Sequence, residues 1–207
     1  MPLKGQRLIC GLRGIAHGRG WQNWEVFMLK LTAEFAFPAG SLACATLSAV
    51  YDVRSRRIPN FITLPAIAVG LLLHAAFGGW RQLVTAAAGG MICGLIFLVF
   101  YLAGGMGAGD VKLITATGCI AGLPLIGHLL LLTALAGGVM ALVLALYRRQ
   151  LAETWHNMHA LAVHHQNMGL TPHPQFNISN ERTLRLPYAL AIAAGSGLSL
   201  CLVVMQR

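Results

Sequence analysis

The chain contains only two aspartates, Asp52 and Asp110, and each lies where a long apolar run meets a short polar segment. An ionisable side chain at the edge of a hydrocarbon span is costly to bury, so such a residue is usually retained for a function. Two carboxyl groups in these positions predict acid–base chemistry, because neighbouring like charges resist simultaneous ionisation and one group keeps its proton.

Asp110 belongs to residues 107–113, which read GAGDVKL and follow the pair Gly104 and Gly105. Glycine lets one backbone approach another closely, so Gly107 and Gly109 can place the carboxylate near a second chain segment. The positive end of a helix dipole should favour the ionised form of Asp110 if a span begins there. Taken alone, the pattern also fits a flexible glycine loop with an aspartate that caps a helix.

Asp52 belongs to residues 51–60, which read YDVRSRRIPN. It follows an apolar run, so it should lie at the negative end of a helix, where retention of the proton is favoured. The alternative is a surface ion pair between Asp52 and Arg54 or Arg56, next to a basic signal that ends the span. The lack of any further aspartate in the chain argues against that alternative.

The composition indicates whether the protein lies in water or in a lipid bilayer. Of the 207 residues, 57% are hydrophobic and 10% are charged, which is far from the averages of soluble domains. The net charge of +9 does not indicate nucleic acid, since Lys and Arg in a membrane protein usually mark cytoplasmic loops. We expect an integral membrane protein that contacts the lipid bilayer and binds no nucleic acid.

Successive apolar segments predict an all-α fold with about six transmembrane helices. A crossing helix needs roughly 20 residues, so the fourth segment is doubtful by length. Breaks are expected at residues 54–60, 78–82 and 122–124, the last because proline removes a helical donor. The six segments are residues 35–51, 61–77, 83–103, 111–123, 125–147 and 186–205.

The predicted topology places both aspartates at the same membrane face. Two membrane crossings lie between them in the sequence, so the chain crosses the bilayer after Asp52 and has returned to the same side at Asp110. The basic residues predict that this face is cytoplasmic, since most of them fall on the same side. They are Arg54, Arg56, Arg57, Lys112, Arg148, Arg149, Arg182 and Arg185.

We expect two regions, a basic tail at residues 1–30 and a membrane-embedded domain at 31–207 with a polar cytoplasmic loop at 148–185. The tail places Lys4, Arg7 and other basic residues on the external side, against the charge rule. It lacks the apolar core and cleavage site of a signal peptide. One hypothesis is that translation starts at Met28, and the alternative is a disordered or interfacial tail.

These motifs resemble those of the type IV prepilin leader peptidases, membrane aspartic proteases of the Gly-x-Gly-Asp type. Asp52 with the following RIPN of residues 57–60 is similar to the first catalytic aspartate of that family, and Asp110 within GAGDVKL to the second. Residues 186–189, LPYA, resemble the start of its closing helix. The resemblance extends over residues 31–207.

The resemblance implies a substrate and a location. The substrate would be a prepilin whose hydrophobic helix shares the membrane, cut at the cytoplasmic face of the bacterial inner membrane, with pilus assembly machinery as a further partner. Longer members carry an additional cytoplasmic segment with paired cysteines and also methylate the new amino terminus. That segment is missing here, so the chain resembles the short, peptidase-only form of tight-adherence (Flp) pilus systems.

The implied mechanism uses Asp52 and Asp110 without a covalent intermediate. On helix-end grounds Asp110 is provisionally the ionised base that activates water, and Asp52 the protonated acid that polarises the scissile carbonyl. Gly107, Gly109 and Lys112 would support the site. Lys112 either keeps the nearby carboxylate charged or extends toward the lipid headgroups.

No metal or other cofactor is expected. Several histidines fall within residues 156–173 and invite a metal hypothesis, but the surrounding polar residues read as a solvated loop, and the family resemblance requires no metal. They are His156, His159, His164, His165 and His173. The five cysteines form no C-x-x-C pair, which excludes a zinc knuckle by spacing. His74 and His128 are expected to be satisfied interfacial residues.

Two alternatives remain at this point. A protease similar to presenilin or signal-peptide peptidase would share the Tyr-Asp pair and Gly-x-Gly-Asp, but the continuation Ile58-Pro59-Asn60 and the six short spans argue against it. A small proton-coupled transporter would use the aspartates as a proton relay across the bilayer. Carboxylates at one membrane face suit such a relay poorly.

Overall fold

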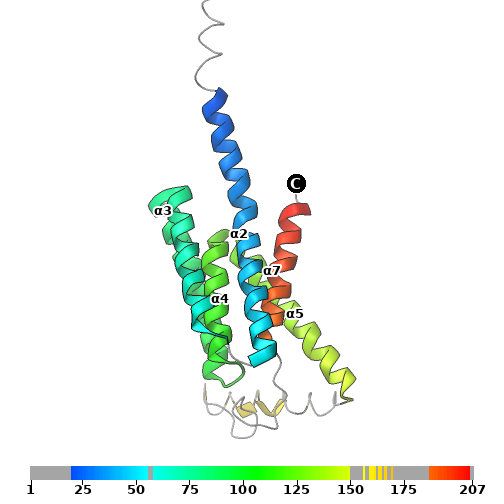
Figure 1. The fold of residues 1–207 in the computed structure, drawn as a ribbon. Coiled ribbons are helices and arrows are strands. Elements are labelled where there is room, and N and C mark those ends of the chain that lie inside the picture. Colours follow the sequence, from blue (N-terminus) through cyan, green and yellow to red (C-terminus); the bar gives the residue numbers. More distant parts are fainter. Residues whose placement is uncertain are drawn as a thin grey trace, which may run out of the picture. The chain divides into compact units, whose positions relative to one another are not determined.

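The protein is described by a computed structural model, which defines the backbone of residues 20–55, 58–149 and 187–205 and a few single positions between 156 and 169. Side chains are described from residue 35 onward. All secondary structure in these residues is helical, so the all-α prediction is confirmed (Figure 1). The predicted tail at 1–30 and polar loop at 148–185 lie largely outside the described residues.

The chain divides into two compact units, Met1–Ala36 and Phe37–Arg207. Helix α2, Gly20–Ser55, runs through this boundary and begins 15 positions before the predicted span at 35–51. Hydropathy marks only the apolar part of a helix, and Lys30 and Glu34 interrupt the apolar run without ending the helix. The second unit contains α2 from Phe37 on and all helices that follow.

Helix α3, Asn60–Leu102, covers the second and third predicted spans. Its backbone leaves helical geometry at Gly79, where φ is 64° and ψ is −156°, a conformation that glycine adopts without steric cost. His74 Nδ1 lies 3.2 Å from Gln82 Oε1, although eight positions of straight helix would separate these residues by about 12 Å. The chain therefore reverses at Gly79, and the predicted break at 78–82 is confirmed.

The two arms of α3 both pack on α4, Ala108–Ala121. In the first arm, Asn60 contacts Lys112 and Gly70 faces Ile120, so this arm runs parallel to α4. The second arm runs antiparallel, because its contacts descend along α4: a Cβ at Gly89 would meet Gly118 and one at Gly94 would meet Thr115. The beginnings of α3 and α4 consequently lie at the same end of the unit.

Helix α4 has 14 residues, which corresponds to about 21 Å and is shorter than a hydrocarbon core of roughly 30 Å. It ends at Gly122, whose φ is 73°, and a 3-10 turn, η1 (Leu123–Leu125), leads into α5, Ile126–Tyr147. The predicted break at 122–124 is therefore confirmed. The doubtful fourth span is a helix too short to cross hydrocarbon alone.

Helix α7, Tyr188–Met205, packs mainly against α5 and also touches α4. Three stretches in the described part are long and apolar enough to cross a membrane, and they are Asn60–Leu102, Leu123–Tyr147 and Tyr188–Met205. Since the first of these is the two-armed α3, the described residues fit an integral membrane protein. The count of six crossings stays a prediction.

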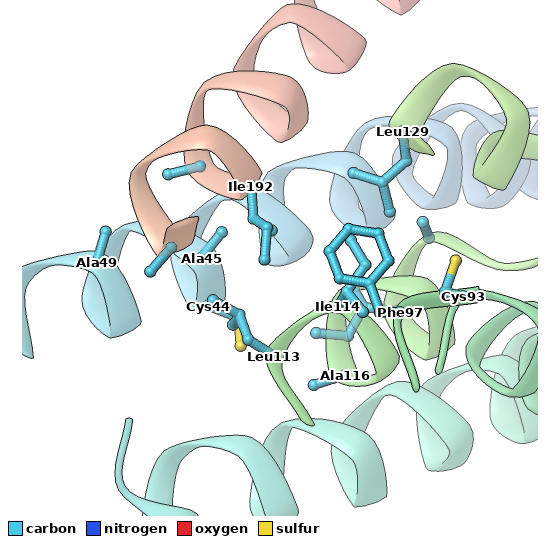
Figure 2. Packing of buried hydrophobic residues seen from close by; sticks show 14 of the residues in the cluster. Cys44, Ala45, Ala49, Cys93, Phe97, Leu113, Ile114, Ala116, Leu129 and Ile192 are labelled. Atoms are coloured by element: carbon cyan, nitrogen blue, oxygen red, sulfur yellow. The ribbon is translucent and has the colours of Figure 1, made fainter. Parts of the chain in front are cut away.

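The core of the second unit combines small residues with a few large ones (Figure 2). Leu113 and Ile114 of α4 are fully buried at its centre, with Leu129 of α5 and Ile192 of α7 packed around them. Large apolar side chains on the outer faces of the helices are exposed, as expected where lipid replaces water. Without a hydrophobic force between helices in lipid, close packing of small residues stabilises their association.

The contact between α3 and α4 at Gly89 can be tested by substitution. A Cβ there would lie 3.0 Å from both Gly118 O and Leu123 N, backbone atoms that cannot rotate away. We expect Gly89→Ala to lower the free energy of unfolding in detergent by about 1–3 kcal/mol, because the two helices must separate.

Gly138→Ala in α5 is the matched control, since a Cβ at Gly138 meets nothing within 4 Å. Alanine in a helix interior should stabilise this position by about 0.5–1 kcal/mol. Equal unfolding midpoints for the two variants would contradict the packing described for α3 and α4.

Candidate active site

The ends of three helices meet at one end of the second unit. The ring of Tyr51, in the last turns of α2, makes an edge contact with Phe61 of α3, with centroids 5.7 Å apart. The start of α3 in turn contacts the start of α4 through Asn60 and Lys112. Asp52 and Asp110 therefore occupy the same end of the bundle, as the predicted hairpin requires.

Asp110 is the third residue of α4, and its carboxylate Oδ2 accepts a hydrogen bond of 3.2 Å from the backbone N–H of Gly107. This bond satisfies one of the donors that a helix start leaves free. In the preceding glycine-rich turn, the backbone of Gly104 has a left-handed conformation, with φ of 79°. The Gly107 amide thus fixes the carboxyl group at the head of the helix.

Gly109 allows the segment that follows Asp52 to approach α4. A Cβ at this position would lie 3.1 Å from the Cβ of Ile58, which is tighter than ordinary packing allows. Ile58 belongs to the RIPN stretch that carries the resemblance, whereas Arg56 and Arg57 lie outside the described residues. The glycine between Ala108 and Asp110 therefore serves close approach, as predicted from its type.

The two carboxyl groups interact electrostatically. Burial raises the pKa of Asp110 to about 6, with a further increase from the negative charge of Asp52, while the hydrogen bond from Gly107 opposes the shift. Burial also raises the pKa of Asp52. The two carboxyl groups therefore share one site, and each keeps its proton to a higher pH than an isolated aspartate would.

From the helix ends alone, the ionised form of Asp110 was expected to be favoured. A helix start favours an ionised carboxylate by only about 0.3–1 kcal/mol at an exposed site. Burial of Asp110 and repulsion by Asp52 outweigh that contribution. The provisional assignment of Asp110 as base and Asp52 as acid stays a prediction, and the burial of Asp110, which sequence position does not reveal, favours the opposite roles.

Lys112 is exposed, and its Nζ donates a hydrogen bond of 3.0 Å to Oδ1 of Asn60. Its partner is thus a neutral amide at the beginning of α3. Neither of the two predicted roles, support of the carboxylate charge or extension toward headgroups, included this bond.

Tyr188 is a neighbour of Asp110 to which sequence reasoning gave no role. It is the first residue of α7, its ring makes an edge contact with Phe97 at a centroid distance of 5.9 Å, and its phenol interacts electrostatically with Asp110. A Cβ at Gly137 would lie 3.2 Å from its hydroxyl oxygen. The stretch LPYA was the only signal that could have pointed to this residue.

His74 is buried and has partners on both ring nitrogens. Nε2 lies 2.9 Å from the carbonyl oxygen of Ile120, Nδ1 lies 3.2 Å from Gln82 Oε1, and the ring stacks on Phe37 with centroids 4.0 Å apart. The prediction of a satisfied residue is confirmed for His74. It ties the far end of the α3 hairpin to α4.

Within the described residues, no three His, Cys, Asp or Glu side chains form a group that could hold a metal ion. His165 and His173 of the histidine-rich segment lie outside the described residues. Cys44, Cys93 and Cys119 are buried free thiols, and Cys201 is exposed.

Comparison with known proteins gives one match. Residues 40–142 match the model of the type IV leader peptidase family, a range that contains Asp52, Asp110 and all contacts between α3 and α4. No curated protein and no solved structure shows significant similarity to the chain.

The raised pKa of Asp110 predicts a pH-dependent stability. In the unfolded chain an aspartate loses its proton near pH 3.9, whereas the folded protein keeps it until about pH 6. The stability that depends on this proton is complete below pH 4 and is lost as the pH rises through 6. Asp110→Asn mimics the protonated group, so it should be more stable than the wild type at pH 7.5, by up to about 3 kcal/mol.

Unfolding midpoints in detergent between pH 4 and pH 8 measure this effect. The advantage of Asp110→Asn should shrink to zero near pH 4, and that of the uncharged control Gly138→Ala should not change with pH. A difference for Asp110→Asn that is the same at both ends of the range would refute the raised pKa.

Proposed function

The chain belongs, through residues 40–142, to the type IV leader peptidase family, and we propose that it is an aspartic endopeptidase that removes the leader peptide from prepilin-like proteins. The family indicates a membrane-bound peptidase, which agrees with the apolar helices of the described part. The observation that carries the aspartic mechanism is the interaction between Asp52 and Asp110. Two interacting carboxyl groups can provide one base and one acid, because the raised pKa of Asp110 keeps its protonated form available to a higher pH than in an isolated aspartate.

In the proposed first step, ionised Asp52 accepts a proton from a water molecule as the water oxygen attacks the scissile carbonyl carbon. Protonated Asp110 donates its proton to the carbonyl oxygen, so a neutral tetrahedral diol forms. Asp110 is assigned as the proton donor in this step because burial and the charge of Asp52 favour its protonated form.

In the second step the carbon–nitrogen bond breaks and Asp52 delivers its newly acquired proton to the leaving nitrogen. Asp110 takes a proton back from one hydroxyl of the diol, which becomes the product carboxylic acid. Both aspartates return to their starting states, so no covalent enzyme intermediate and no cofactor is needed in the proposed cycle.

The proposed substrate is a prepilin of the tight-adherence (Flp) type, whose hydrophobic helix lies in the same bilayer. The carboxyl groups lie at helix ends, where a cleavage site next to a membrane helix could reach them without a deep pocket. Arg54 in the last turn of α2, Lys112 and Arg148 are basic residues near that end or its loops, which favours the cytoplasmic face of the inner membrane.

The family match supports a leader peptidase over the presenilin-like protease and the proton-coupled transporter. The meeting of both carboxyl groups at one end of the bundle also suits hydrolysis better than transport, because a relay needs groups distributed across the bilayer. Pilus assembly proteins remain proposed partners.

Asp52→Asn and Asp110→Asn test the proposal when co-expressed with candidate prepilins from the same genome. Cleavage, read as a mobility shift of the prepilin, should fall at least about 100-fold in each variant, because one acid–base group is removed. Each variant should be inserted in the membrane at the wild-type level, since the Gly107 amide can also bond to an asparagine at position 110.

Thr46→Ala is the control for a substitution in α2. In the part of the chain that the structure describes, its hydroxyl bonds to Leu42 O and Ala43 O of its own helix, so the variant should cleave normally. Retained cleavage in either asparagine variant would remove that aspartate from the mechanism, and failure of the wild type to cut any candidate would refute the substrate class.

A further inference from the structure

Lys112 and Asn60 connect the two segments that carry the aspartates. Asn60 is the first residue of α3, eight positions after Asp52, and Lys112 is two positions after Asp110 in α4. The ammonium group of Lys112 donates a hydrogen bond of 3.0 Å to Oδ1 of Asn60. A hydrogen bond with an ionised donor is stronger than one between neutral groups, so this contact can hold the two segments together.

The side chain of Lys112 contacts Asn60 and does not face Asp110. Residues two positions apart on a helix point to different faces, so the two side chains are not neighbours on α4. Within the described ranges, the influences on the pKa of Asp110 are burial, the charge of Asp52 and the Gly107 amide. The partner of Lys112 thus lies on another segment.

A close apolar contact next to this bond also holds the two segments together. Gly109 and Ile58 approach closely directly beside the bonded pair, where any Cβ at position 109 would lie 3.1 Å from Ile58. The chain between Asp52 and Asn60 is thus attached to α4 at two neighbouring places. Loss of the hydrogen bond would remove the polar member of these two neighbouring contacts, while the packing of Ile58 on Gly109 would stay.

We propose that Lys112 and Asn60 form a positioning pair that keeps Asp52 and Asp110 at the separation needed for catalysis, with neither residue transferring a proton. This inference rests on the proposed peptidase function and assigns to the Lys of GAGDVKL and the Asn of RIPN one shared role. The pair acts through the geometry of the two helix starts. Loss of either residue should therefore lower the cleavage rate by a similar factor, and loss of both should lower it no further.

A double-mutant cycle tests this pairing through the cleavage rate of a prepilin that the wild type cuts. Lys112→Met and Asn60→Leu should each lower the rate about 10- to 100-fold, because small displacements of catalytic groups have effects of this size. The double variant should be no slower than the slower single variant, because the second substitution removes nothing further.

A reciprocal variant, Asn60→Lys with Lys112→Asn, restores donor and acceptor in exchanged positions. It should recover most of the lost rate, which a merely structural requirement for the original residues would not allow. Arg81→Met is the matched control, since it removes an exposed positive charge at the opposite end of the α3 hairpin and should cleave normally.

Three results would overturn the pairing. Losses that multiply in the double variant would show that the residues act independently, and failure of the exchanged variant to recover would show that the bond is not the cause. A pH–rate profile shifted by Lys112→Met but unchanged by Asn60→Leu would assign Lys112 an electrostatic role on Asp110.

The outcome is separable from that of the proposed function. If the wild type cuts no prepilin, the same cycle is read from unfolding midpoints in detergent, where the two single variants should show coupled losses of stability. Additive losses of stability would reject the pair, whatever the protein cleaves.

Discussion

Repulsion between the carboxyl groups of Asp52 and Asp110 is the interaction on which the proposed chemistry depends. Two aspartates in separate, fully solvated positions would both be ionised at neutral pH, and neither could act as an acid. Burial and repulsion by Asp52 raise the pKa of Asp110 to about 6, and burial also raises the pKa of Asp52. One site thereby offers a base and an acid from two identical side chains.

Maintaining this repulsion costs free energy, which other contacts of the second unit must offset. The reversal at Gly79 folds α3 into two arms, and both arms pack on the short helix α4. Glycines on the second arm let the backbones approach within contact distance of Gly118 and Gly122. His74 closes the far end of the hairpin, and Lys112 with Asn60 closes the near end, so the aspartates cannot separate without loss of these contacts.

The positions of the helices could be predicted well from the sequence where a local cause exists. Gly79 and Gly122 both adopt positive φ, and each was expected as a break from the glycine and proline around it. The hydrophobic pattern also predicted an all-α membrane fold and the meeting of the two aspartates. The start of α2 was missed, because helical backbone continues into polar residues that hydropathy does not register.

Features that depend on tertiary distances could not be predicted. Helix-end reasoning took account of the helix start at Asp110 but not of the burial that raises the pKa of this group. The bond between Lys112 and Asn60 joins residues 52 positions apart, and Tyr188 reaches Asp110 only through the packing of α7. The cytoplasmic orientation, the number of crossings and a start at Met28 depend on the membrane or on translation, and they stay predictions.

The most direct measurement is an infrared titration of the protonated carboxyl band in the wild type and in Asp52→Asn. In the wild type, the band that is lost in Asp110→Asn should reach half intensity near pH 6, as the pKa of about 6 requires. In Asp52→Asn the midpoint of the same band should move to lower pH, because the repelling charge is gone. An Asp110 midpoint that is identical with and without Asp52 would show that the two carboxyl groups do not share a site.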